Sequence, residues 1–177
     1  MPYLGKEILN VMIKKITDKL IYIGVDDTDI DLFENQYPVP DGMSYNSYLL
    51  LGEKIAVMDT ADDEWLANLE EGLAGRTPDY LVVQHMEPDH SALIDEVVKR
   101  YPAVTIVTTA KAQKMLQNFF AEMPAAEIRT VGEGDTIGLG GLTLCFTLAP
   151  MVHWPEVMMT YVPEIKTIFS ADGFGKF

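Results

Sequence analysis

Cysteine is nearly absent from this sequence. The single one, Cys145, lies in the apolar run LTLCFTL at residues 142–148. One cysteine excludes an internal disulfide framework and any metal site built from thiolates. The apolar surroundings of Cys145 favour a buried structural thiol over a nucleophile. Histidine is also scarce, with only three in the chain, so the positions of those three are informative.

Long apolar runs are missing too. None approaches the ~20 residues that a membrane-spanning helix needs. Residues 1–19 mix lysines with apolar residues and lack the cationic head and apolar core of a secretory signal. We therefore expect a cytoplasmic protein with no membrane partner.

Basic residues are outnumbered, with 13 Lys and Arg against 27 Asp and Glu and a formal net charge of −14. A surface of this charge repels a phosphate backbone, which argues against nucleic acid as a partner. A neutral or cationic small substrate, or a bound metal, fits the charge better. The 177 residues, 48% of them hydrophobic, are typical of one soluble globular domain.

Apolar runs and turn residues predict a layered α/β fold. Strands are expected at residues 20–25, 44–51, 54–60, 79–84, 103–109, 127–131, 142–150, 156–162 and 166–172, with 44–51 and 54–60 as a hairpin. Helices are expected at residues 61–73, 91–101 and 111–123, with Ser91 at or near the cap of the second. The glycine-rich run 131–141 lacks a phosphate-binding pattern and is expected to be a hairpin turn. Strands that alternate with helices between runs of strands indicate an α/β (α+β) sheet protein with antiparallel parts.

Metal-binding side chains gather where predicted strands end. The stretch HMEPDH places His85, Glu87, Asp89 and His90 directly after the strand at 79–84. His153 and Asp172 stand at the ends of two later strands. Three imidazoles and three carboxylates suit two first-row metal ions. A carboxylate can bind one metal through each oxygen, and Asp172 is the candidate bridge.

Simpler explanations exist for the single residues. A lone histidine at a strand end, such as His153, is more often a surface residue than a ligand. Asp172, which precedes a glycine, could be a turn residue, and Asp89 could serve only as a capping residue. Asp59, at the end of the strand 54–60, is either a hydrogen-bond partner of a ligand histidine or an exposed acid. The density of ligand-capable groups in residues 85–90 is what favours a metal site there.

The spacing of these motifs resembles that of the flavodiiron proteins, the A-type flavoproteins of anaerobes. The resemblance lies in H-x-E-x-D-H at 85–90, HWPE at 153–156, FSADGFG at 169–175 and FENQYPVPDGMSYNSYLL at 33–50. It implies a metallo-β-lactamase-like αββα sandwich with two non-haem iron ions. Related hydrolases have H-x-H-x-D-H. Here Glu87, an oxygen ligand, replaces the middle histidine, which favours iron over zinc at the site.

The resemblance also implies how the ligands are divided. His85, Glu87 and His153 would bind one iron, Asp89 and His90 the other, and Asp172 would bridge them. The family has one further histidine beyond the bridging aspartate, and residues 173–177 contain none. We therefore expect residues 1–177 to be a partial diiron domain whose first iron site is the better preserved. The second half of the sandwich and the FMN-binding flavodoxin domain would be absent.

Three functions remain open on these grounds. The resemblance implies an oxidoreductase that reduces O2 to water or NO to nitrous oxide, with electrons from FMN and from rubredoxin or a similar donor. It also implies a head-to-tail homodimer. The first alternative is a zinc-dependent hydrolase of the same fold, in which metal-bound water attacks an ester or thioester. The second is a diiron module that binds O2 or NO without turnover.

Overall fold

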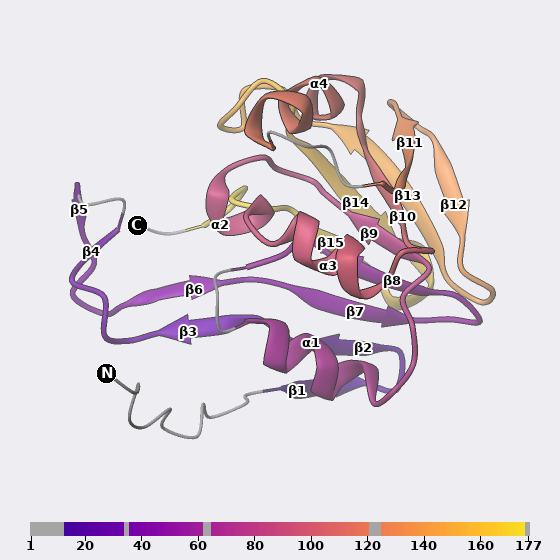
Figure 1. Cartoon of the computed structure of the whole chain (residues 1–177), viewed down its shortest axis with the longest axis horizontal. Helices are drawn as coiled ribbons and strands as arrows, with labels where there is room; N and C mark the ends of the chain where they lie inside the picture. The colour runs from indigo at the N-terminus through magenta and orange to yellow at the C-terminus, as the bar shows by residue number, and fades with distance from the viewer. Residues whose placement is uncertain (1–12, 34–35, 62–64, 121–124, 176–177) are drawn as a thin grey trace.

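The structure is a computed structural model of the chain, and it describes residues 13–33, 36–61, 65–120 and 125–175. Two β-sheets are stacked on one another, and helices cover the outer face of the larger sheet (Figure 1). This is a layered α/β arrangement of the kind predicted.

The larger sheet has seven strands in the order β1-β2-β7-β8-β9-β10-β11. Their bounds are β1 (Lys14–Thr17), β2 (Leu20–Tyr22), β7 (Tyr48–Leu51), β8 (Ile55–Met58), β9 (Tyr80–Val82), β10 (Thr105–Thr109) and β11 (Glu127–Val131). The predicted hairpin is confirmed, because β7 and β8 pair antiparallel with Leu51 opposite Ile55. Strands β8 to β11 are parallel, so the loops that follow them meet at one edge of the sheet.

The smaller sheet is antiparallel, in the order β12-β13-β14-β15. It consists of β12 (Thr136–Gly138), β13 (Thr143–Leu148), β14 (Met158–Val162) and β15 (Thr167–Phe169), with the 3-10 turn η1 (Pro163–Ile165) before β15. Two short ribbons complete the strands: β3 (Val25–Asp27) with β6 (Met43–Tyr45), and β4 (Leu32–Phe33) with β5 (Tyr37–Pro38).

The helices are α1 (Trp65–Leu73), α2 (Pro88–Ser91), α3 (Ile94–Arg100) and α4 (Ala110–Phe119). Thr109 caps the N-terminus of α4, since its hydroxyl accepts a hydrogen bond from the Ala112 N–H at 3.1 Å. No helix among the described residues is long and apolar enough to cross a membrane.

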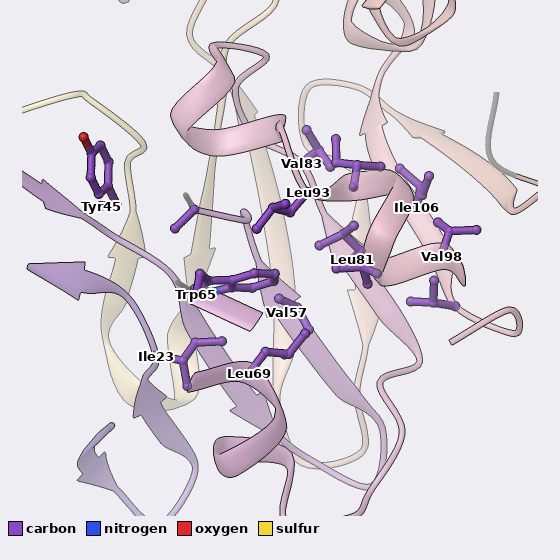
Figure 2. Close-up of a cluster of buried hydrophobic side chains, with 14 of the residues drawn as sticks. Ile23, Tyr45, Val57, Trp65, Leu69, Leu81, Val83, Leu93, Val98 and Ile106 are labelled. Atoms are coloured by element: carbon purple, nitrogen blue, oxygen red, sulfur yellow. The ribbon is translucent and has the colours of Figure 1, made fainter. Parts of the chain in front are cut away.

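Successive side chains along the strands of the larger sheet point to opposite faces, and each face packs into its own hydrophobic core. Leu49, Val57, Leu81 and Ile106 face the helices and belong to one buried cluster with Trp65 and Leu69 of α1. Figure 2 shows Val57 beside Trp65 and Leu69, and Ile106 beside Val98 of α3. The intervening residues face the smaller sheet, where they pack against its buried side chains. These are Leu50, Ala56, Met58, Val82 and Val107 on one sheet and Leu144, Phe146 and Met158 on the other. The larger sheet is thus covered on both faces, and this fixes its strand ends in space.

Several expectations about single segments were wrong in detail. The run 44–51 is not one strand: it is interrupted at residues 46–47, where pairing of β6 with β3 gives way to pairing of β7 with β2. The Ser47 hydroxyl donates to the Asp59 carbonyl at 2.8 Å. The run 131–141 is more than a turn, because it contains β12, which carries the chain from the larger sheet to the smaller. Cys145 is only half-buried, on the opposite side of β13 from Leu144 and Phe146.

The helix expected at 91–101 is divided, and Ser91 does not cap it. Pro88 starts α2 three residues earlier, with Glu87 in the capping position. Ser91 is the last residue of α2, and its hydroxyl donates to the carbonyls of Met86 and Glu87. The helices expected at 61–73 and 111–123 correspond to α1 and α4, and residues 62–64 and 121–124 lie outside the described residues.

Candidate metal centre

The site lies at the edge where β8 and β9 end, beside the turns that follow β13 and β15. His85 follows β9, Glu87 precedes α2, and Asp89 and His90 lie within α2. His153 lies in the turn between β13 and β14. Asp172 was expected to close its strand, but β15 ends at Phe169 and Asp172 lies in the turn beyond it.

Hydrogen bonds between segments set the loop 83–91 in place. The Val83 N–H donates to the Val107 carbonyl at 2.9 Å, and the Met158 N–H donates to the Gln84 carbonyl at 3.1 Å. The Thr60 N–H and hydroxyl both donate to the His90 carbonyl. The loop is therefore tied to both sheets, as a site assembled from distant segments requires.

The first group of donors contains His85, Glu87, His153 and Asp172, with ligand atoms that all lie within 4.8 Å of one another. Glu87 Oε2 is 3.0 Å from His85 Nε2 and 2.8 Å from His153 Nε2. Asp172 Oδ2 is 3.2 Å from each of the same two nitrogens. These four side chains come from three segments that are far apart in the sequence.

The second group contains Asp89, His90 and Asp172, again within 4.8 Å of one another. His90 Nε2 is 2.9 Å from Asp172 Oδ1 and 3.6 Å from Asp89 Oδ2. Asp172 belongs to both groups, with Oδ2 facing the first and Oδ1 facing the second. All six residues singled out in the sequence therefore lie together.

The arrangement of donors fits bound cations. His85 Nε2 and His153 Nε2 approach to 3.3 Å, although two neutral nitrogens that both present lone pairs repel at this distance unless a cation or proton lies between them. Asp89 Oδ1 is buried and has no hydrogen-bond partner within the described part of the chain. Imidazole nitrogen and carboxylate oxygen without sulfur form a donor set that iron accepts.

Protons on the histidines compensate the carboxylates when no cation is bound. Burial acts to lower the pKa of His85, but its hydrogen bonds with Asp172, Glu156 and Glu87 outweigh burial and raise this pKa to about 9. Burial likewise opposes charging of His90, yet Asp172 and Asp59 raise its pKa well above the usual value. A metal ion would have to displace these protons.

The pKa values of the two carboxylates Asp172 and Asp89 shift in opposite directions. Burial acts to raise the pKa of Asp172, but the hydrogen bonds with His85 and His90 hold it far below its usual value. Burial raises the pKa of Asp89 to about 6, against the opposing charge of His90. Asp172 is thus available as an anion at any physiological pH, whereas a cation that binds Asp89 must keep it deprotonated.

Asp59 is buried, with 2% of its surface exposed, so of its two interpretations the exposed acid was wrong. Its Oδ1 accepts the Gln84 N–H at 2.7 Å, and its Oδ2 lies 3.4 Å from His90 Nδ1. Its backbone has φ of 56°, a left-handed conformation that is uncommon for non-glycine residues and that Asp adopts more readily than most. Asp59 is therefore the acid that faces the outer nitrogen of His90.

Glu156 was missed in the sequence. Its Oε1 accepts hydrogen bonds from His85 Nδ1 at 2.8 Å and from the Met86 N–H at 3.0 Å. The only signal for it was an acid in HWPE, three residues after His153, and its partners lie 70 and 71 residues away in the sequence.

The site is buried at its base and open at His153. Side-chain exposure is 0% for His85 and 8% for Glu87 but 51% for His153. The Trp154 ring stands perpendicular to the His85 ring with centroids 5.2 Å apart. Met151 and Val152, just before His153, are exposed, so access to the site is from this turn.

Comparisons with known proteins agree with this geometry. A family model described as ODP family beta lactamase matches residues 43–177. The fold matches the flavodiiron protein of Giardia intestinalis with a TM-score of 0.86 and 30% identity, over 94% of this chain and 41% of that one. The chain belongs to the flavodiiron family, in its metallo-β-lactamase-like domain. The fold class inferred from the resemblance is confirmed.

Other flavodiiron relatives extend the comparison. The rubredoxin oxygen:oxidoreductase of Desulfovibrio gigas matches with a TM-score of 0.80 and 30% identity over 90% of this chain and 40% of that one. Diflavin flavoprotein A 1 of Synechocystis is 38% identical over 84% of this chain and 26% of its own length. The anaerobic nitric oxide reductase flavorubredoxin of Pectobacterium atrosepticum is 35% identical over 91% and 33%. This flavodiiron domain thus spans between about a quarter and two fifths of these relatives.

Proposed function

We propose that this chain is the diiron domain of a flavodiiron oxidoreductase that reduces O2 to water, NO to nitrous oxide, or both, with electrons from FMN. The observation that carries the proposal is the pair of donor groups that share Asp172. One ion at each group would lie between nitrogen and oxygen donors, and each oxygen of Asp172 faces one group.

The six residues would divide as the family resemblance implies. His85, Glu87 and His153 would bind one iron, Asp89 and His90 the other, with Asp172 between them. The first group has four members and the second three, counting Asp172 in both. This difference supports the expectation that the first iron is held more firmly.

Each part of the site would have a distinct task. Two ferrous ions, when bound, supply two electrons and adjacent open positions for both atoms of O2 or for two NO molecules. Because reduction of O2 to water takes four electrons, FMN in a flavodoxin domain would supply the remainder, fed by a rubredoxin-type donor. The three carboxylates neutralise cationic charge, the buried base keeps the donors in fixed positions, and the open turn at His153 admits a small substrate.

The activities for which two relatives are named support the substrate class. One relative is a rubredoxin oxygen:oxidoreductase, and another is an anaerobic nitric oxide reductase flavorubredoxin. Both gases are small and neutral, and both suit a site that is exposed at His153. The proposal includes either gas, or both, as the substrate. It also includes a head-to-tail homodimer and a cytoplasmic location.

Anaerobic reconstitution tests it. The chain is loaded with Fe(II) alone and, in a parallel sample, with Zn(II) alone, and each sample is desalted and assayed for bound metal and for activity. We expect iron in up to twofold excess over protein, and reduced FMN should then consume NO faster than with metal-free chain. Retention of zinc with esterase activity would instead identify a hydrolase. Binding of NO without oxidation of the reductant would identify a module without turnover.

A further inference from the structure

Glu156 joins the two halves of the first donor group. Its own segment, residues 153–157, also carries His153 and leads into β14 of the smaller sheet. Its carboxylate reaches the loop after β9 of the larger sheet, where it accepts from His85 Nδ1 and from the Met86 N–H. One side chain therefore links the segment that carries His153 to the segment that carries His85 and Glu87.

The Glu156 backbone is itself held. The Thr109 hydroxyl donates to the Glu156 carbonyl at 3.1 Å while it caps α4. Two residues further along, the Met158 N–H donates to the Gln84 carbonyl. The carboxylate thus projects from a backbone that is anchored on both sides.

The bond to Nδ1 determines which nitrogen of His85 faces the site. Since a carboxylate only accepts, Nδ1 must carry a proton to bond with Glu156. Nε2, which lies 3.0 Å from Glu87 Oε2 and 3.3 Å from His153 Nε2, is then the nitrogen that would give up its proton to a bound cation. The Glu156 side chain is fully buried, so its bond to His85 belongs to the packed interior and is not a contact at the exposed surface.

We propose that Glu156 is the positioning residue of the first metal site: its carboxylate fixes the ring orientation and tautomer of His85 and holds the His85 and His153 segments in register. The inference rests on the proposed function, because it assumes a metal at that site. It adds a residue outside the six candidate ligands. Loss of such an outer partner typically weakens metal binding by about 10-fold to 100-fold.

Two conservative variants test separately the length and the charge of the Glu156 side chain. Glu156→Asp keeps the carboxylate but draws it back by one methylene, so it no longer reaches His85 Nδ1. Glu156→Gln keeps the reach and an accepting oxygen but loses the charge. Glu164→Asp and Glu164→Gln are matched controls, since Glu164 is an exposed acid that similarly accepts from the Thr143 N–H and hydroxyl.

The readouts are anaerobic Co(II) titration and the visible absorption spectrum of bound Co(II), which reports ligand geometry without turnover. We expect Glu156→Asp to weaken the tighter Co(II) equivalent by roughly 10-fold to 100-fold and to change its spectrum. Glu156→Gln should retain the spectrum and lose less affinity, and both Glu164 variants should match the unsubstituted chain.

Each other result has a definite meaning. Unchanged affinity and spectrum in Glu156→Asp would overturn the positioning role, as would a folded Glu156→Gln that binds more weakly than Glu156→Asp. If Glu156→Asp loses its circular dichroism signal, Glu156→Gln decides alone: a folded Gln variant with an altered spectrum would overturn the inference. An unsubstituted chain that binds no Co(II) would instead remove the proposed function and the positioning role with it.

Discussion

Replacing Asp172 by asparagine removes the one carboxylate that faces both donor groups while it leaves the shape of the side chain nearly unchanged. Asp172 Oδ2 lies 3.2 Å from His85 Nε2, and Oδ1 lies 2.9 Å from His90 Nε2. Cations bound at the two groups would repel one another, and this carboxylate is the negative charge placed between them. The variant should therefore affect the second equivalent of metal much more than the first.

The size of the effect follows from these distances. At about 3 Å and an effective dielectric constant of about 20, one unit charge contributes about 5 kcal/mol. The Asp172 side chain is 23% exposed, and solvent screening reduces this value. We take about 3 kcal/mol, which corresponds to roughly a 100-fold loss of affinity for the second metal.

The assay is a two-step Fe(II) or Co(II) titration of the Asp172→Asn variant under anaerobic conditions, with metal counted after desalting. We expect the first equivalent to remain, since His85, Glu87 and His153 are untouched, and the second to be lost. Two retained equivalents with unchanged affinity would refute the bridging role. Loss of both with an intact fold would mean that the first site also depends on Asp172 and that His85, Glu87 and His153 do not hold a metal without it.

Three further predictions concern other parts of the molecule. Glu87→Ala should lower iron content at the first site, because its Oε2 faces both His85 and His153; unchanged iron by elemental analysis would contradict its role as a ligand. The metal-free chain should lose stability as pH rises from about 6.5 through about 9, since His85 has its pKa raised on folding to about 9. Its contribution, on the order of 3 kcal/mol, is complete below the unfolded pKa of about 6.5, so urea midpoints that are level across this range would refute the assignment. Phe146→Ala should cost about 3–5 kcal/mol, because Phe146 is fully buried between the two sheets; a thermal midpoint that does not fall would show that the sheets do not pack as described.

The sequence alone determined the types of ligand and their place at strand ends. Imidazole and carboxylate groups are recognisable from residue identity, and a dense cluster such as residues 85–90 is local enough to read directly. Apolar runs predicted β8, β9 and β10 because buried parallel strands are almost continuously hydrophobic. The break between α2 and α3 and the interruption between β6 and β7 were not predicted, since contacts with other segments override local periodicity there.

Only the tertiary structure decided which distant residues meet. His85 reaches His153 across 68 positions of sequence and Glu156 across 71. These contacts depend on how the two sheets are stacked, which no local pattern encodes. Asp59 and Glu156 look like ordinary strand-end acids in the sequence, and the fold buries both beside the outer nitrogens of His90 and His85. Composition and spacing thus specified the donors, whereas the stacking of the sheets decided the geometry in which they meet and the partners that orient them.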